Sequence, residues 1–436
     1  MVWRCLHRHC ILKERLMARI LFHSLIFSPD GVSTAYLMAD LAQELQKLGH
    51  SLTVLTTTPH YNQVESELKA QPLRPCGDGC FRSELEGIDV WHLSMGERTS
   101  DMGARSKDYL SFHWRSLKWG LSRGKSFDIV IAPSPPLSIG VIAWLIARWN
   151  RAKCIYNVQE LYPDFAIHQG LVNKPLTIWA FKKLESFVYN RSNAVTTIAD
   201  RFTRMVKPRC AKPDKVHTIP NFVDIDFYRP LPRDNVFARE HGLLENFVVM
   251  YAGNIGVAQD WTAVLHAADE LRGEPIRFVI LGDGTQRNWL AGEIARRKLD
   301  GVLLLPYQPR ERMAEINASC DAAMITMAPK AGWDGFPSKI YTTLACGKPS
   351  IVSTEEDSEL AWIVNESRCG TVVPVEQNAA FASAVLNAYR RRGELEEEGQ
   401  RGRRFVEENY SKRAVAMRYH SLIQSLTEQK SSEHAH

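Results

Sequence analysis

Residues 331–352, with the sequence AGWDGFPSKIYTTLACGKPSIV, constrain the fold more than any other stretch. A turn containing Gly-Phe-Pro-Ser leads into an amphipathic run from Lys339 to Cys346, and Gly347-Lys348-Pro349 ends it before an apolar strand. Ser338 stands where it can cap this helix, whose first N–H groups would then point outward as a seat for phosphate. Lys339 places a cation at the helix end that disfavours cations, which predicts a bound anion. The alternative is an ordinary loop, helix and buried strand of an α/β domain.

The length and the order of apolar runs predict two domains. A chain of 436 residues exceeds what one core usually supports. Residues 19–25, 33–48 and 52–56 read as strand, helix and strand, which is the opening of a doubly wound sheet. A charged run broken by prolines, residues 229–233, reads as a linker. We therefore expect an extension at 1–16, which places the natural start at Met1 or Met17, domains at 17–229 and 230–410, and a helix and tail at 411–436.

Paired glycines follow two strands of the second domain. Gly253 and Gly256 come after the strand at 247–252, and Gly282 and Gly284 come after the strand at 277–281. Closely spaced glycines at a strand end let the backbone approach a phosphate. Arg287 stands where a dinucleotide fingerprint needs its third glycine, so we do not expect NAD.

Polar residues also follow two strands of the first domain. The strand at 154–158 delivers Gln159 and Glu160 to its carboxyl end, where open α/β sheets bind ligands. Gly31 lies in the turn after the first strand, where a purely structural role is an equal alternative.

The stretch at 331–352 resembles the donor-sugar motif of family 4 of the retaining glycosyltransferases, which have the GT-B fold. It is most similar to the branch that builds colanic acid and O-antigen repeat units. In that family two glutamates frame the motif, and the matching positions here are Asp334 and Thr342. The resemblance implies that Asp334 holds sugar hydroxyls, whereas Thr342 cannot hold the ribose as a carboxylate does. Losing that charged hydrogen bond costs roughly 1.5 to 3 kcal/mol, or about tenfold to a hundredfold in donor affinity.

The resemblance covers most of residues 17–426 and implies the other site residues. Gln159 and Glu160 would face the reacting sugar, and Tyr307 would line the nucleobase pocket. Most of the family has Arg and Lys where this chain has Asn254 and Gln259, so we expect Lys339 and helix N-termini to neutralise the diphosphate. The implied donor site is completed by Gly31, Gly253, Gly256, Gly282, Gly284, Gly335, Phe336, Pro337 and Ser338.

By this resemblance the chain is a GT-B protein: two Rossmann-like α/β domains facing across a cleft, with a helix at 405–426 returning to the first domain. The implied reaction moves a sugar from a UDP- or GDP-linked donor, with retention, to a glycan or an undecaprenyl-diphosphate-linked acceptor in surface polysaccharide biosynthesis. We expect no metal and no further cofactor. Alternatives are a catalytically silent nucleotide-sugar scaffold, because Thr342, Asn254 and Gln259 depart from the wider family, and a GT-B epimerase.

Composition bears on partners and compartment. A formal charge of +5 is too weak to indicate nucleic acid. The nine cysteines follow no regular spacing, which favours a reduced, cytosolic compartment. The groupings at 5–10 and 76–80 lack the usual paired spacing of a zinc site.

A basic and aromatic segment at 104–125 indicates contact with the membrane. Such a helix can lie at the surface of an anionic membrane; alternatively, its aromatic face packs on the sheet. No apolar run is long enough to cross a bilayer. We therefore expect a protein peripheral to the inner face of the cell membrane.

Overall fold

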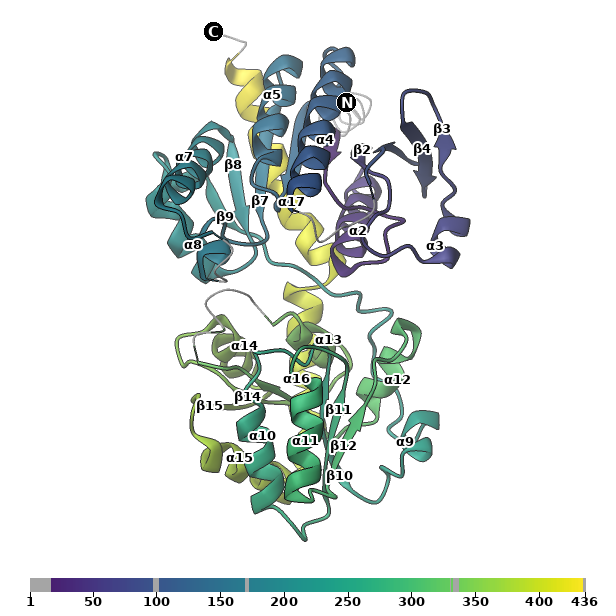
Figure 1. The fold of residues 1–436 in the computed structure, drawn as a ribbon, viewed down its shortest axis with the longest axis vertical. Helices are drawn as coiled ribbons and strands as arrows, with labels where there is room; N and C mark the ends of the chain where they lie inside the picture. The colour runs from purple at the N-terminus through teal and green to yellow at the C-terminus, as the bar shows by residue number, and fades with distance from the viewer. Residues whose placement is uncertain (1–16, 97–101, 169–171, 330, 332–336, 434–436) are drawn as a thin grey trace, which may run out of the picture. The chain divides into compact units, whose positions relative to one another are not determined.

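The computed structural model describes residues 17–96, 102–168, 172–329, 331 and 337–433, and it divides into two compact units (Figure 1). Unit 1 comprises residues 1–220 and 415–436, and unit 2 comprises residues 221–414. The stretch at 229–233, which we expected to be a linker, lies inside unit 2.

Unit 1 is built on a nine-stranded sheet with the order β3-β4-β5-β2-β1-β6-β7-β8-β9. From β5 to β9 in this order, all neighbouring strands pair in parallel. At the other edge, β3 and β4 form an antiparallel hairpin, and β4 also pairs antiparallel with β5. The strand order reverses between β1 and β6, so the ligand crevice of such a sheet opens there. The strands are β1 Arg19–His23, β2 Ser51–Thr57, β3 Arg74–Pro75, β4 Cys80–Leu85, β5 Ile88–Leu93, β6 Ile129–Pro133, β7 Lys153–Val158, β8 Ala194–Thr197 and β9 Val216–Thr218.

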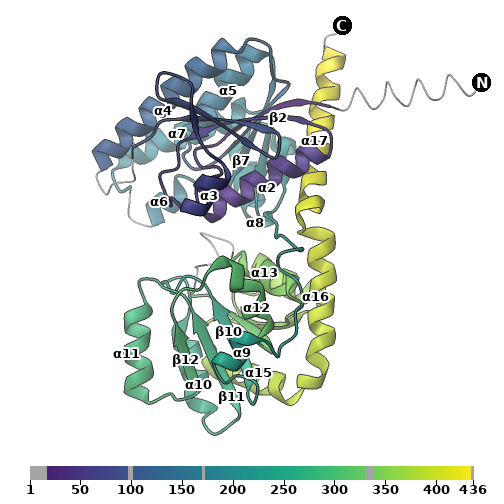
Figure 2. The ribbon, with the colours of Figure 1, turned by 90° about the vertical axis from the view of Figure 1, so that its right-hand side faces the viewer.

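Helices cover both faces of this sheet. Figure 2 shows α4, α5 and α7 on one face, and α2 and α17 on the other. The helices of unit 1 are α2 Ser33–Lys47, α3 Glu65–Ala70, α4 Met102–Ser122, α5 Ile139–Asn150, α6 Asp164–His168, α7 Pro175–Arg191, α8 Asp200–Val206 and, from Val415 on, α17 Lys412–Glu433. The helix α17 is fixed by Tyr419, whose hydroxyl accepts a hydrogen bond from Asn157 Nδ2 at 3.0 Å.

Unit 2 is built on a six-stranded parallel sheet with the order β12-β11-β10-β13-β14-β15. Its order reverses between β10 and β13. The strands are β10 Phe247–Ala252, β11 Ile276–Leu281, β12 Val302–Leu305, β13 Ala322–Thr326, β14 Ser350–Ser353 and β15 Gly370–Val373. The helices are α9 Val236–Glu240, α10 Trp261–Glu270, α11 Arg287–Arg297, α12 Met313–Ala318, α13 Lys339–Ala345, α14 Glu359–Ser367, α15 Asn378–Arg390 and α16 Leu395–Asn409.

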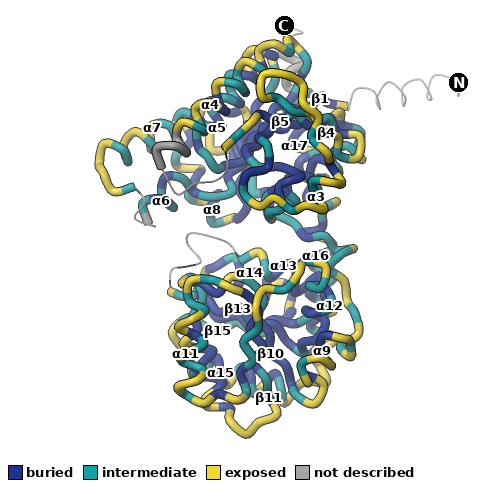
Figure 3. The backbone as a smooth tube through the Cα atoms, turned by 45° about the vertical axis from the view of Figure 1, so that its right-hand side comes forward, coloured by how far each residue is buried: buried dark blue, intermediate teal, exposed yellow. Residues whose placement is uncertain are grey.

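The core of unit 2 lies on both faces of its sheet, as the dark blue strands in Figure 3 indicate. On one face, Val249, Phe278 and Met324 pack against α10 and α15. On the other, Ile325 and Val352 pack against α13, α14 and α16. Near-continuous apolar strands are what a parallel sheet covered by helices requires, and both units are therefore Rossmann-like.

The structure confirms the predicted fold of two Rossmann-like domains and the return of the C-terminal helix to the first. The single helix expected at 405–426 is wrong, because the chain breaks between α16 and α17. There Val223 N donates to the carbonyl of Tyr410 at 2.9 Å, and the Ser411 hydroxyl caps the next helix through Ala414 N at 3.2 Å. The helix α17 extends to Glu433, beyond the end expected at residue 426.

Between β2 and β5 the chain forms α3 and the β3–β4 hairpin. In the part of the chain that the structure describes, every helix is too short or too polar to pass through a bilayer.

Candidate functional site

Two glycine turns stack on each other at the carboxyl edge of the unit 2 sheet, where the strand order reverses. Gly253 N donates to Leu281 O, and Ile255 N donates to Asp283 O, both at 2.8 Å. A Cβ atom at Gly282 would lie 1.8 Å from the carbonyl oxygen of Gly253, and both glycines have φ near +145°. Only glycine allows this close approach, which explains the paired glycines in the sequence.

The Lys339 side chain lies directly over Gly253. A Cβ atom at Gly253 would meet Lys339 Cε at 2.0 Å and Nζ at 2.7 Å. The same amine lies 5.2 Å from the ring centroid of Tyr251, which is a cation–π distance. The lysine from the start of α13 and the glycine from the end of β10 therefore form one site, although 86 positions separate them in the sequence.

The electrostatics of this lysine favour an anion. Burial lowers the pKa of Lys339, because a partly desolvated ammonium is costly. None of the ion pairs among the described residues includes Lys339. A diphosphate placed against the amine would supply the missing negative charge and raise the pKa again.

Asn254 and Gln259 shape the turn between β10 and α10. The Gln259 Oε1 atom accepts a hydrogen bond from Gly256 N at 3.1 Å, and the Tyr251 hydroxyl donates to Asn254 O at 2.6 Å. A Cβ atom at Gly256 would lie 2.7 Å from Asn254 Nδ2. Because Gln259 already uses the Gly256 amide, that amide is not available to a phosphate in this conformation.

The expected cap at the start of α13 is wrong. Ser338 has helical backbone angles, φ −57° and ψ −12°, and its side chain makes no capping hydrogen bond. The N–H groups of Ile340 and Tyr341 donate to the carbonyls of Pro337 and Ser338 at 3.2 and 3.1 Å, so they do not point outward. The positive charge at this end of the helix comes from Lys339 instead.

The remaining predicted donor residues differ in how the structure presents them. The Thr342 hydroxyl donates to Lys339 O at 2.9 Å, within the helix. Tyr307 follows β12 and is 73% exposed. Asp334, Gly335 and Phe336 lie outside the described residues.

In unit 1, Gln159 is held at the carboxyl end of β7. Its backbone N–H donates to Ser134 Oγ at 3.0 Å, and its Nε2 donates to Asn157 Oδ1 at 2.6 Å. Asn157 in turn donates to Tyr419 of α17, so the returning helix supports the position of Gln159. Burial raises the pKa of the adjacent Glu160 carboxyl, which favours its neutral form.

Gly31 packs against a neighbouring loop. Its N–H donates to Asn62 O at 2.8 Å, and a Cβ atom would lie 2.4 Å from the side chain of Val64. Asp30 was not predicted as a site residue; it is a buried carboxylate that accepts hydrogen bonds from the N–H groups of His60, Tyr61 and Asn62 at 2.8 to 3.0 Å. Asp30 thus holds the loop after β2 against the turn after β1; an acidic residue next to the turn glycine is the signal that was available.

No group of three or more His, Cys, Asp or Glu side chains in the described residues could hold a metal ion. Cys76 and Cys80 lie at the β3–β4 hairpin, and the grouping at 5–10 lies outside the described residues.

Comparison with known proteins identifies the class to which these units belong. Residues 34–221 match the model of the glycosyl transferase 4-like domain, and residues 246–391 match the model of glycosyl transferases group 1. These two matches follow the two units and cover most of the chain. The chain therefore belongs to the glycosyltransferases of the GT-B fold.

Among curated proteins the chain is similar to two bacterial glycosyltransferases. It is 23% identical to the putative colanic acid biosynthesis glycosyl transferase WcaI of Escherichia coli (strain K12), over 84% of this chain and 90% of WcaI. It is 24% identical to the probable glycosyltransferase WbjE of Pseudomonas aeruginosa, over 61% of this chain and 66% of WbjE.

Solved structures share the fold. Anabaena HepE in complex with UDP has a TM-score of 0.69 at 14% identity, covering 93% of this chain and all of HepE. WaaG, a glycosyltransferase involved in lipopolysaccharide biosynthesis, has a TM-score of 0.61 at 12% identity, covering 93% of this chain and 99% of WaaG.

Proposed function

We propose that this chain transfers a sugar from a UDP- or GDP-linked donor to a lipid-linked or glycan acceptor, with retention of the anomeric configuration, in surface polysaccharide biosynthesis. The observation that carries the proposal is the partly buried Lys339 amine, which lies over Gly253 at the point where the unit 2 strand order reverses. Ligands of open α/β sheets bind at this point, and a partly desolvated cation there suits a diphosphate.

The relatives support the nature of the donor and of the pathway. HepE was solved with UDP and with UDP-glucose, and the name of WcaI assigns it to colanic acid biosynthesis. The same classes of donor and product are proposed for this chain.

Lys339 acts on the leaving group in the proposed reaction. As the bond between sugar and diphosphate breaks, negative charge gathers on the departing oxygens and positive charge on the sugar ring. The Lys339 ammonium stabilises the first charge. Asn254 and Gln259 stand in place of the cations found in most of the family, so neither can share this task; a further cation near them is Arg287, whose Nε donates to Gly282 O at 3.3 Å.

The sugar ring is held by carboxylate and amide groups. We propose that Asp334 accepts hydrogen bonds from sugar hydroxyls, and that Gln159 and Glu160 of unit 1 face the reacting carbon. A Glu160 carboxyl with a raised pKa can donate a hydrogen bond when neutral and stabilise positive charge when ionised.

A lipid-linked acceptor requires the enzyme to approach a membrane, and α4 and α7 offer a suitable face. Leu110, Trp114 and Leu121 form one exposed stripe on α4, and Leu176 and Trp179 are exposed at the start of α7. Lys107, Lys118 and Lys125 flank the α4 stripe, and Lys182 and Lys183 follow on α7; all five are exposed. We call these residues the α4–α7 face and propose that it contacts anionic lipid.

The proposed function is tested by comparing alanine variants of Lys339 and Lys348, which lie at the first residue of α13 and beyond its end. Lys339→Ala should lower the release of UDP or GDP from a donor by about a hundredfold or more, because the charge-assisted contact to the leaving group is lost. Donor turnover with a lipid-linked acceptor extract is measured by nucleotide release, after thermal-shift screening has selected the donor.

Lys348→Ala is the matched control. Lys348 lies at the other end of α13, where its Nζ donates to Cys320 O at 2.7 Å, and its loss should leave turnover within about threefold. Equal losses in the two variants would contradict the role of Lys339. Donor binding by the wild type without any nucleotide release would instead favour the nucleotide-sugar scaffold.

A further inference from the structure

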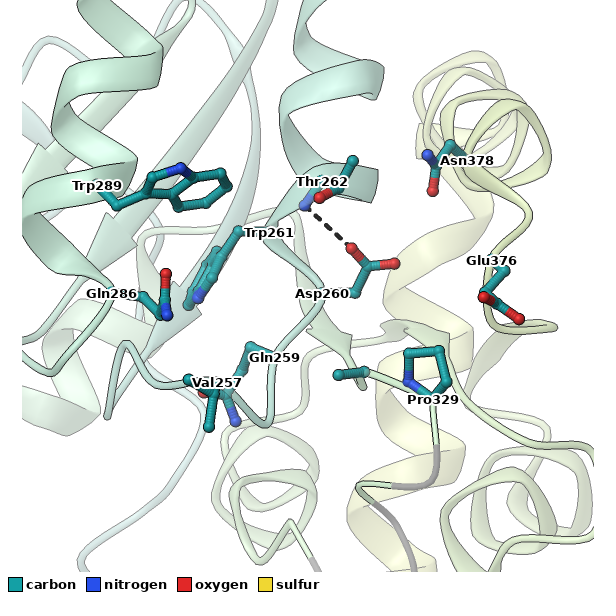
Figure 4. Close-up of a pocket in the computed structure, with 11 residues that line it drawn as sticks. Val257, Gln259, Asp260, Trp261, Thr262, Gln286, Trp289, Pro329, Glu376 and Asn378 are labelled. Carbon is teal, nitrogen blue, oxygen red and sulfur yellow. Dashed lines mark hydrogen bonds between the residues drawn. The ribbon is translucent and has the colours of Figure 1, made fainter.

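A hollow of about 490 Å³ opens on unit 2 beside the N-terminus of α10. Its volume falls within the range of small-molecule sites. In Figure 4, Trp289 and Gln286 lie on one side of the hollow, and Asp260, Glu376 and Asn378 lie on the other. These residues come from loops and helices on the α10–α11–α15 face of the sheet.

The hollow is separate from the small cavity at Lys339. That cavity is lined by Met313, Asn317 and Thr342 together with Lys339, and these residues belong to α12 and α13 on the opposite face of the sheet. Gln259 is the residue of the predicted donor site that lines the hollow. The hollow and the cavity at Lys339 can therefore bind different ligands.

The walls of the hollow are fixed by backbone hydrogen bonds. Asp260 N donates to Thr326 O at 3.1 Å, and Ala328 N donates to Ala258 O at 2.9 Å, which ties the loop before α10 to the end of β13. Gln286 N donates to Ile255 O at 2.9 Å on the other side. Little ordering of the protein is needed when a ligand enters.

Two carboxylates and the amide side chain of Asn378 lie on one side of the hollow. Asp260 Oδ1 accepts from the N–H groups of Thr262 and Ala263 at 3.0 and 3.1 Å, and the second oxygen of the carboxylate points toward Glu376 (Figure 4). The Asn378 Oδ1 atom is buried and accepts no hydrogen bond from the described residues. Glu376 has a left-handed backbone with φ of 62°, a conformation that costs energy for a residue with a side chain and that is concentrated at binding sites.

Trp289 supplies an aromatic surface across from these acceptors. Its side chain is 46% exposed although it belongs to α11, where a polar residue would be expected on the outer face. An indole ring packs well against the C–H face of a sugar ring, while carboxylate and amide oxygens accept hydrogen bonds from hydroxyls.

The charged side chains that line the hollow disfavour anionic ligands. Among the described residues that line it there is no Lys, Arg or His, and its charged side chains are the carboxylates of Asp260 and Glu376, which disfavour a phosphate or diphosphate. Its two carboxylates fall short of a metal site, and one Asp260 oxygen already caps α10. A neutral, hydroxyl-rich ligand is the class that the side chains suit.

We propose that this hollow is a second carbohydrate site, which binds neutral sugar units of the growing polysaccharide apart from the nucleotide-sugar donor. The identification of the glycan as acceptor or product rests on the proposed function; the binding itself does not require transfer. Holding the glycan beside the glycine turn would raise its local concentration for successive encounters.

The test measures glycan binding by the full chain without any donor. The labelled protein is applied to an array of neutral and aminated oligosaccharides, and the dissociation constant of the best neutral ligand is then measured by calorimetry. Trp289→Ala and Glu376→Gln should each weaken binding at least tenfold, and Trp289→Phe should keep most of it.

Two control variants separate the sites. Trp362→Ala removes another exposed tryptophan of unit 2, at α14, and should leave glycan binding within about twofold. Lys339→Ala should also keep glycan binding while losing nucleotide release. Thermal unfolding and circular dichroism of each variant confirm that it is folded.

Each outcome decides the proposal. Tenfold weakening in Trp289→Ala, with binding kept in Trp362→Ala, supports it. Absence of any neutral ligand on the array, binding confined to aminated sugars, or equal affinity in Trp289→Ala overturns it. If glycan binding behaves as expected but no donor supports nucleotide release, the proposed transfer fails and the carbohydrate site stands.

Discussion

At the scale of single residues, the site depends on the lack of a side chain at Gly253. Gly253 has φ of +146° and gives up the space that the Lys339 side chain occupies. The side chain of Lys339, at the start of α13, therefore occupies space that a side chain after β10 would fill.

This arrangement predicts the effect of adding one methyl group. Gly253→Ala should displace Lys339, because the new Cβ would lie 2.0 Å from Lys339 Cε, and should lower nucleotide release nearly as far as Lys339→Ala. Its free energy of unfolding should fall by more than about 1 kcal/mol, since alanine is strained at this backbone angle. Steady-state nucleotide release and chemical denaturation measure the two effects.

Gly292→Ala provides the comparison. Gly292 lies within α11, where an added Cβ meets nothing within 4 Å, so alanine should stabilise the helix by roughly 0.5 to 1 kcal/mol and leave activity unchanged. Wild-type turnover in Gly253→Ala would contradict the positioning of Lys339 by this glycine.

How much of the site could be predicted from the sequence differs between residues. The sequence indicated glycines after both β10 and β11, where backbone can approach a phosphate, but it did not indicate that Gly253 and Gly282 contact each other. The contact between Gly253 and Lys339 could not be derived, because it depends on the register of β10 against β13. The Ser338 cap failed because a capping residue type does not fix the backbone angles that capping requires.

At the scale of helices and strands, the parallel strands were readily predicted, because their apolar runs stand out between turns. The strand at 247–252 was predicted with the bounds that the structure has. The break between α16 and α17 was not, since the hydrogen bond from Val223 that diverts the backbone comes from a segment far away in the sequence. The amphipathic pattern of α4 left two interpretations open; the structure confirms in part that its aromatic face packs on the core, and membrane contact stays a proposal.

In α4, Phe112 is buried and Trp119 packs against the core, whereas Trp114 is 65% exposed. Arg123 stacks on Trp91 and Trp119, and Arg115 donates to backbone carbonyls, so these two cations are already engaged. The exposed lysines of the α4–α7 face remain for contact with lipid.

This division predicts which α4 and α7 residues carry membrane binding. The double variant Trp114→Ala/Trp179→Ala should weaken co-sedimentation with phosphatidylglycerol liposomes at least tenfold, because both exposed indoles are lost from the interface. Lys107→Gln/Lys118→Gln should weaken binding at low salt by roughly 1 kcal/mol per lysine and make it less dependent on salt.

Trp362→Ala again serves as the control, since it removes an exposed indole from unit 2. Failure of the wild type to bind anionic liposomes at low salt would remove the membrane proposal, and an unchanged double variant would place the contact elsewhere.

At the scale of the whole molecule, the two units differ in their buried histidines. Among the described residues the buried histidines all lie in unit 1. Burial lowers the pKa of His23 to about 3 and those of His92 and His113 to about 4. Burial and the neighbouring His420 lower the pKa of His50 to about 4.

These shifts predict that acid unfolds unit 1 first. Each folded pKa lies below the unfolded value of 6.5, so the unfolded chain binds more protons, and stability falls as the pH drops from 6.5 to about 4. A fully buried histidine contributes roughly 1.4 kcal/mol per pH unit in this window. Calorimetry at pH 7.5 and pH 5, with hydrogen exchange to assign the transitions, should show the unit 1 transition moving to lower temperature.

His23→Phe tests the cause. His23 is buried against Phe112, and its ring nitrogens have no hydrogen-bond partner among the described residues, so phenylalanine should be tolerated and should flatten the pH dependence. An acid transition that begins in unit 2, or one that is unaffected by His23→Phe, would contradict this explanation.

The return of α17 to unit 1 means that this unit is not a contiguous piece of the chain, because residues 415–436 belong with residues 1–220. A gene fragment ending at residue 220 would encode a sheet whose β7 and β8 lack their Tyr419 partner. A stand-alone unit 1 would therefore need residues 415–433 restored, either fused through a short spacer or supplied as a second polypeptide.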